Sequence, residues 1–121
     1  MDVNSVNTVM NASSVADFRA KVSSLHIDSN LISYIAKIVN QTRNNSSLYL
    51  GASPRASLSI LSTAKAIAAM NGRDFVTPDD IKFVATPVLN HRVMLTPEKE
   101  MEGISTKDVI SQIIEKIEVP R

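Results

Sequence analysis

The sequence contains no cysteine and no tryptophan, and only 4% of its residues are aromatic. Without cysteine the chain forms no disulfide and no thiolate metal site, and this composition fits a reducing compartment. The 121 residues suit one compact domain, and 44% of them are hydrophobic. Aliphatic rather than aromatic side chains must therefore build the core.

A large net charge and a long apolar run are also missing. The formal net charge is only +1, so no strong attraction to nucleic acid or anionic membranes is predicted. No apolar stretch approaches the roughly 20 residues that cross a bilayer. Residues 1–5 lack the basic start and apolar stretch of a signal peptide. We therefore expect a cytoplasmic protein with no membrane insertion and no nucleic-acid partner.

The motifs of most catalytic sites are absent. There is no G-x-x-x-x-G-K-[ST] loop, no apolar strand ending in paired acids for Mg²⁺ and no glycine-rich dinucleotide fingerprint. His26 and His91 lack the close second ligand of a His-x-x-x-His zinc site, so we interpret each as a partly buried side chain near a helix end. No metal site is predicted, and the chain alone is expected to be catalytically inactive.

Apolar residues at helical spacing predict a mainly α fold, a small bundle of about five helices joined by short extended segments. The predicted helices span about 15–24, 30–43 and 54–71, a fourth starts at Thr77-Pro78 and buries residues as far as Leu89, and a last one starts near 105 and ends before 120. Polar residues are available as caps for each start. These caps are Ser13 or Ser14, Asp28 or Ser29, Ser53, Thr77, and Ser105 with Asp108.

The same patterns predict which residues are buried and where the chain turns. The first helix is expected to bury Val15 and Phe18, and the third to bury Leu58. Gly72 is expected to end the third helix in a left-handed conformation. Residues 96–103, with three glutamates and a proline, predict a mobile charged loop.

The segment Leu-Gly-Ala-Ser-Pro-Arg-Ala at 50–56 is the most informative stretch. Gly51 permits a bend, Ser53 is predicted to cap the following helix, and Pro54 fills the first helical position. Arg55 then lies in the first turn, where the helix dipole already places partial positive charge. A cation at this position indicates that an anion is supplied from elsewhere, and phosphate is the first candidate. The alternative is a surface arginine that pairs with a neighbouring acid or packs along the bundle.

Four ordered motifs carry a resemblance to a known family. They are residues 51–56, 64–66, 72–81 and 88–92, and Tyr34-Ile35 and Thr42-Arg43 upstream add to them. In this order they closely resemble the C-terminal part of MoxR-type AAA+ ATPases. The resemblance implies a helical lid that follows an α/β nucleotide-binding core and closes over the bound nucleotide. It divides the chain into a disordered linker stub at 1–14 and a lid domain at 15–121.

The resemblance also implies a role for the 51–56 motif. Arg55 would be the sensor-2 arginine that reaches the γ-phosphate and takes part in catalysis, with Ser53 and Pro54 beside it at the cofactor. A guanidinium offers forked donors to phosphate oxygens. ATP and Mg²⁺ are expected in the parent protein and not on this chain alone, because the Walker A and B motifs, sensor 1 and the arginine finger are missing.

The implied partners are the chain's own AAA+ core domain and the neighbouring subunits of a ring. Proteins with von Willebrand factor A domains are further expected partners. The implied activity of the parent is ATP hydrolysis that drives chaperone-like remodelling of partner proteins.

Two other functions remain open on the sequence. The helix start at 76–81 also suits a histone-like DNA-binding module, although the basic residues are scattered and form no stripe. A pure protein-interaction bundle would make Arg55 incidental. Arg73 and Asp74 are interpreted as a turn pair, and Arg92 either binds a partner or snorkels from the core.

Overall fold

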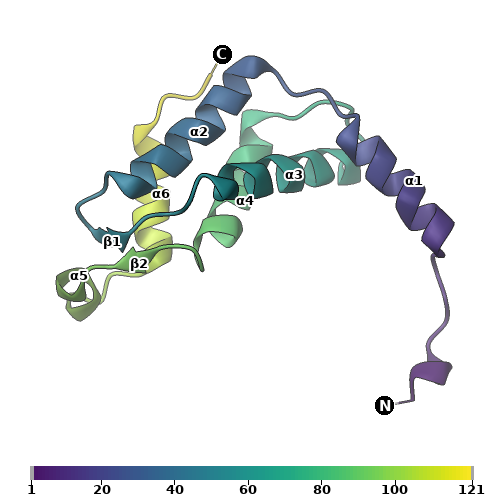
Figure 1. Cartoon of the computed structure of the whole chain (residues 1–121), viewed down its shortest axis with the longest axis horizontal. Helices are drawn as coiled ribbons and strands as arrows, with labels where there is room; N and C mark the ends of the chain where they lie inside the picture. Colours follow the sequence, from purple (N-terminus) through teal and green to yellow (C-terminus); the bar gives the residue numbers. More distant parts are fainter. Residues whose placement is uncertain (1, 121) are drawn as a thin grey trace.

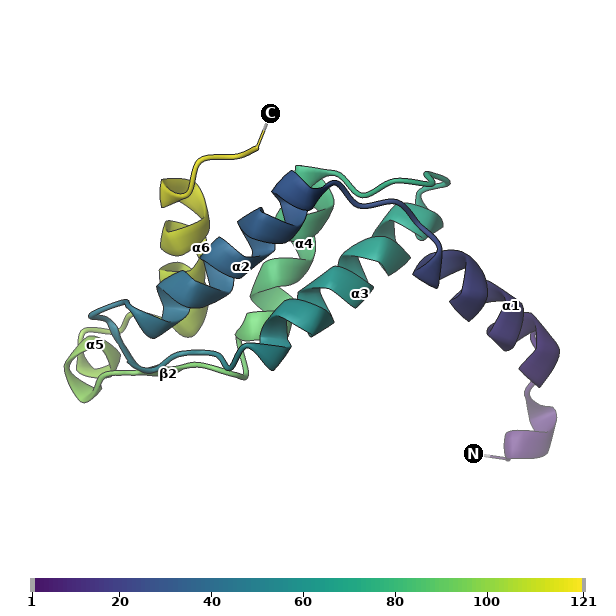
Figure 2. The ribbon, with the colours of Figure 1, turned by 45° about the horizontal axis from the view of Figure 1, so that its top comes forward.

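The computed structural model of the chain describes residues 2–120. Its elements in chain order are η1 (Val3–Ser5), α1 (Ala12–Ser23), α2 (Ser29–Arg43), β1 (Leu48–Leu50), α3 (Arg55–Met70), α4 (Pro78–Leu89), β2 (Met94–Leu95), α5 (Pro97–Met101) and α6 (Thr106–Lys116). Helices α2, α3, α4 and α6 form a bundle, and α1 extends away from it beyond one end of α3 (Figures 1 and 2). The predicted small helical bundle is confirmed.

The predicted division of the chain at residue 14 stays a prediction, and the boundary falls inside α1. Met1 of the linker stub and Arg121 of the lid domain lie outside the described residues. Within residues 2–120, no helix combines the length and the apolar character that crossing a membrane requires.

Small side chains let α3 lie close to its neighbours. Helix α3 packs along α4 and also contacts α1 and α2. Its buried positions are Ala56, Ile60, Ala64 and Ala68, so three of the four carry only a methyl group. The aliphatic core continues on α2, α4 and α6, where the buried residues include Ile38, Ile81, Leu89 and Ile110. One continuous cluster holds the four helices together.

The turn from α3 to α4 is fixed by backbone geometry and then by charge. Gly72 has φ +74°, and the N–H of Arg73 donates to the carbonyl of Ala68 at 3.0 Å, which closes the helix as predicted. Arg73 then donates two hydrogen bonds to the Asp80 carboxylate, both at 2.6 Å. The predicted turn pair of Arg73 with Asp74 is wrong, because the guanidinium reaches past it to the buried Asp80.

Asp80 also completes the start of α4. Thr77 caps the helix with its side chain, and the Asp80 carboxylate accepts the Thr77 N–H at 2.8 Å, which makes a reciprocal capping box. The hydrogen bonds from Arg73 hold the pKa of Asp80 below its usual range, against the effect of burial, which raises it. The predicted cap and the proline at the first position, Pro78, are confirmed.

Two strand contacts tie the helix connections together. β1 pairs antiparallel with β2, with Leu48 opposite Leu95 and Leu50 opposite Met94. A parallel bridge joins His26 to Phe75. The loop between α2 and α3 is therefore held against the loop between α4 and α6.

Helix α1 differs from the prediction at both its start and its surface. Asn11, not Ser13 or Ser14, caps it by accepting the Ser14 N–H at 2.8 Å. Val15 is 38% and Phe18 53% exposed, and no residue of α1 is buried. The expected burial is wrong because α1 extends away from the bundle and packs against α3 near one end.

Two further expectations are wrong. Leu58 is 65% exposed, because the α3 face that packs in the bundle is the one that carries the small residues. Residues 97–101 form the short helix α5 instead of an irregular loop, since Thr96 accepts the Lys99 N–H and Pro97 begins the helix.

Replacing Asp80 tests the role of its ion pair in the fold. We expect Asp80→Ala to lower the free energy of unfolding by about 2–3 kcal/mol, because it removes a buried ion-pair partner and half of the capping box. Asp79→Ala changes an exposed acid in the same turn and should cost about 0.5 kcal/mol or less. Urea unfolding measures both, and equal losses would contradict this role for Asp80.

The same carboxylate predicts the response to acid. The pKa of Asp80 is lower in the folded chain than in the unfolded chain, so its stabilisation is complete above the unfolded value of about 4 and is lost as the pH falls through the folded value. The pKa of Asp108 is lowered in the same direction by hydrogen bonds from Ser105. Urea midpoints measured between about pH 6 and pH 3 should fall more steeply for the wild type than for Asp80→Asn. Parallel curves would contradict the assignment.

Candidate functional site

The loop at 51–54 lies directly against the last turn of α2. A Cβ on Gly51 would lie 2.4 Å from the Thr42 carbonyl oxygen and 2.6 Å from the Arg43 Cα, so no side chain fits there. The buried Thr42 hydroxyl donates to the Val39 carbonyl at 2.6 Å and accepts the Ala52 N–H at 3.0 Å. Gly51 is therefore required for a close approach of two backbones, not only for the bend that the sequence predicts.

This contact sets where α3 begins. Pro54 has helical angles, φ −56° and ψ −24°, and α3 runs from Arg55. The Ser53 carbonyl accepts the Ala56 N–H at 2.9 Å, and the Pro54 carbonyl accepts the Ser57 N–H at 3.0 Å. The predicted Ser53 side-chain cap is wrong: Pro54 occupies the N-cap position, and no side chain caps α3.

Arg55 occupies the first turn of α3, as predicted, and is exposed. The ion pairs among residues 2–120 are Arg73 with Asp80 and Lys99 with Glu102, so Arg55 pairs with none of the described acids. The salt-bridge alternative for Arg55 therefore has no support in the fold. The guanidinium stands at the positive end of a helix with no counter-ion from the described part of the chain.

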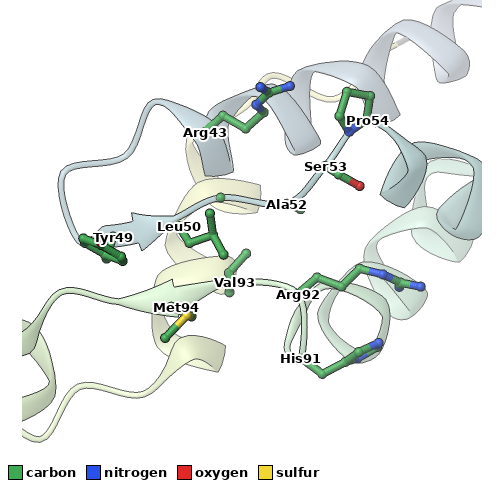
Figure 3. A pocket seen from close by; sticks show the side chains of 11 residues that line it. Arg43, Tyr49, Leu50, Ala52, Ser53, Pro54, His91, Arg92, Val93 and Met94 are labelled. Atoms are coloured by element: carbon green, nitrogen blue, oxygen red, sulfur yellow. The ribbon is translucent and has the colours of Figure 1, made fainter.

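An open pocket of about 670 Å³ adjoins this turn, and we call it the motif pocket. It is lined by Arg43 and by residues 49–54 and 91–94 (Figure 3). Two sequence motifs that are far apart in the chain thus meet across one cavity. The lining holds two arginines and His91 but no carboxylate, so its charge favours an anion.

Arg92 is held in place at the edge of the motif pocket. Its Nη1 donates to the Val88 carbonyl at 2.7 Å, and its Nη2 donates to the Ser59 hydroxyl on α3 at 3.3 Å. Arg92 is half-buried and spans the two helices instead of snorkelling freely. Sequence reasoning missed this bridge and the Thr42 anchor, because only the fold brings either residue to its partner.

The two histidines lie apart. His26 pairs with Phe75 in a bridge between extended segments, and His91 lines the motif pocket on the turn after α4. Both are exposed, so the expectation that they are partly buried is wrong. Within residues 2–120, no three His, Cys, Asp or Glu side chains gather as a metal site.

Comparison with known proteins identifies the class of this fold and site. The family model "AAA lid domain" matches residues 40–113, a range that contains Arg55 and every residue that lines the motif pocket. The chain belongs to the AAA lid domain family. This result selects the ATPase lid from the three classes that the sequence left open.

The relatives place the chain within that family. It is 39% identical to the uncharacterized protein YeaC of Bacillus subtilis, over 83% of this chain and 31% of that protein. It is 35% identical to chaperone MoxR1 of Mycobacterium tuberculosis, over 75% of this chain and 26% of that protein. The resemblance to the lid of MoxR-type AAA+ ATPases is thereby confirmed.

A solved structure supports the same assignment. The crystal structure of a proposed ATPase from Cytophaga hutchinsonii superposes with a TM-score of 0.85 at 37% sequence identity. The match covers 90% of this chain and 36% of that one. The chain thus spans about a third or less of the length of these relatives.

Adding one methyl group at Gly51 tests the close approach. Gly51→Ala should lower the free energy of unfolding by about 1–3 kcal/mol, because the new Cβ meets backbone atoms that cannot move aside freely. Ser53→Ala changes an exposed residue in the same loop and should cost about 0.5 kcal/mol or less. Thermal unfolding of both variants decides, and a Gly51→Ala variant as stable as the wild type would refute the contact.

Proposed function

We propose that this chain is the nucleotide-responsive lid of a MoxR-type AAA+ ATPase and that Arg55 contacts the γ-phosphate of ATP bound by a core domain. The observation that carries the proposal is an exposed arginine at a helix start with no acidic partner among the described residues. The Thr42–Gly51 contact fixes the backbone that leads into Arg55. A side chain placed in this way is half of a site that another domain completes.

The surroundings of Arg55 fit ATP better than they fit the metal. The adjoining motif pocket is basic and has no carboxylate in its lining, which suits phosphate groups. Mg²⁺ takes oxygen ligands, often carboxylates, and no carboxylate lines the motif pocket. ATP binding would therefore draw on Arg55, with Ser53 and Pro54 beside it, while the core domain would supply the Mg²⁺ ligands.

The chemistry expected of Arg55 is electrostatic. Negative charge shifts between phosphate oxygens during phosphoryl transfer, and a guanidinium within hydrogen-bonding distance stabilises it. Arg55 would bond to the γ-phosphate of ATP and lose that partner in ADP. This difference would make the position of the lid depend on the nucleotide.

The wider role follows from this coupling. Lid movement would transmit ATP hydrolysis to neighbouring subunits of a ring and drive chaperone-like remodelling of partner proteins, in the cytoplasm. The name of the Mycobacterium tuberculosis relative, chaperone MoxR1, supports this direction. Proteins with von Willebrand factor A domains are the partners we propose to test first.

Substitution of Arg55 in a protein that joins this chain to its core domain tests the proposal. Arg55→Ala should slow ATP turnover about tenfold or more, since it removes charged hydrogen bonds to phosphate. Arg55→Lys keeps the charge without the fork and should recover part of the rate. Steady-state phosphate release measures both.

The control for this experiment is Lys107→Ala, an exposed cation at the start of α6, which should leave turnover unchanged. Circular dichroism checks that each variant is folded. Normal turnover in a folded Arg55→Ala variant would contradict the proposal and make Arg55 incidental to the lid.

A further inference from the structure

The residues at 90–92 form a motif for which the lid assignment has given no role. They follow α4 and are fixed at both ends of the turn: Asn90 accepts a hydrogen bond from the Thr106 hydroxyl of α6, and Arg92 donates to Ser59 of α3. The turn is therefore held to both α3 and α6. It presents Arg92 to the motif pocket, opposite the 51–54 loop (Figure 3).

Arg92 keeps unused donors in this position. Its bonds to Val88 and Ser59 occupy two of the five N–H donors of a guanidinium. The group is already oriented before any ligand arrives, which lowers the entropy lost on binding. The two hydrogen bonds therefore position the Arg92 guanidinium and leave its other N–H donors available to a ligand.

The anchor on Ser59 also places Arg92 near Arg55. Residues four apart in a helix lie on one face, one turn from each other, so Ser59 lies directly along α3 from Arg55. The Arg92 guanidinium is therefore bonded to the turn of α3 that follows Arg55. Arg55 begins α3, and Arg92 is anchored on its next turn.

The hydroxyl of Ser53 faces this arrangement. In Figure 3 its oxygen points to the side of the loop where Arg92 lies. Ser53 is exposed and does not cap α3, so its hydroxyl remains available to a ligand. A donor hydroxyl and a fixed guanidinium across a pocket without carboxylates make an anion site.

We propose that Arg92, with Ser53, is a second phosphate-binding contact of this lid and holds phosphate groups of the same nucleoside triphosphate that Arg55 contacts. The identity of the ligand rests on the proposed function. A triphosphate carries charge on several oxygens along its length, so one molecule offers separate oxygens to two guanidiniums. Arg92 thereby links the end of α4 to nucleotide binding.

The test is a nuclear magnetic resonance titration of the full 121-residue chain with inorganic tripolyphosphate and, separately, with ATP. Saturable amide shifts should centre on residues 51–53 and 91–94, with a dissociation constant in the millimolar range that a few phosphate contacts provide. Arg92→Gln should weaken both ligands about tenfold, and Ser53→Ala about twofold to threefold. Lys107→Gln should leave the affinity unchanged.

Several outcomes would overturn the proposal. These are equal binding by the wild type and Arg92→Gln, shifts spread over all basic residues without saturation, and binding of tripolyphosphate but not of ATP. If Arg92→Gln loses its amide dispersion, Ser53→Ala decides, because its hydroxyl makes no cap in the fold. Micromolar ATP binding would also contradict a site that needs a second domain.

This test fails separately from the proposed function. Normal ATP turnover with Arg55→Ala would remove Arg55 from the mechanism and leave the tripolyphosphate titration as it is. Conversely, a motif pocket that binds neither ligand would exclude Arg92 as a phosphate contact, and the turnover experiment on Arg55 would still be valid.

Discussion

The contact between Gly51 and Thr42 is the constraint on which the rest of the site depends. Two backbones approach so closely that a single added carbon would collide with the Thr42 carbonyl at 2.4 Å. The Thr42 hydroxyl completes the contact by accepting the buried Ala52 N–H, which would otherwise lack a partner. This contact fixes the end of α2 against the 51–54 loop that leads into α3. The backbone position of Arg55 at the start of α3 is therefore defined.

A second constraint brings the other half of the motif pocket to the first. Arg73 and Asp80 lock the turn between α3 and α4, so the two helices run back along each other. The far end of α4 then returns to the start of α3, where Arg92 reaches Ser59. An ion pair to the buried Asp80 at one end of the helix pair thus helps to position a pocket at the other end.

The sequence predicts local features well and remote ones poorly. The caps Asp28, Thr77 and Ser105 and the left-handed Gly72 are confirmed, and each depends on residues within one turn. The caps predicted at Ser13 or Ser14 and at Ser53 are wrong, because each helix starts one or more residues away from the predicted start. Hydrophobic periodicity does not show whether another element covers an apolar helix face. For this reason the predicted burial of Phe18 on α1 is wrong.

For the site, the position of Arg55 at the start of α3 was predictable, while the Thr42 anchor and the Arg92 bridge required the fold. Thr42 and Arg92 each lie far along the chain from the residue they contact, which is Ala52 for Thr42 and Ser59 for Arg92.

The measurement that tests the central claim most directly is a structure of this lid with its core domain and a non-hydrolysable ATP analogue. The account predicts an Arg55 guanidinium at hydrogen-bonding distance, about 2.7–2.9 Å, from a γ-phosphate oxygen. An Arg55 that pairs with an acid of the core domain, away from the nucleotide, would contradict it.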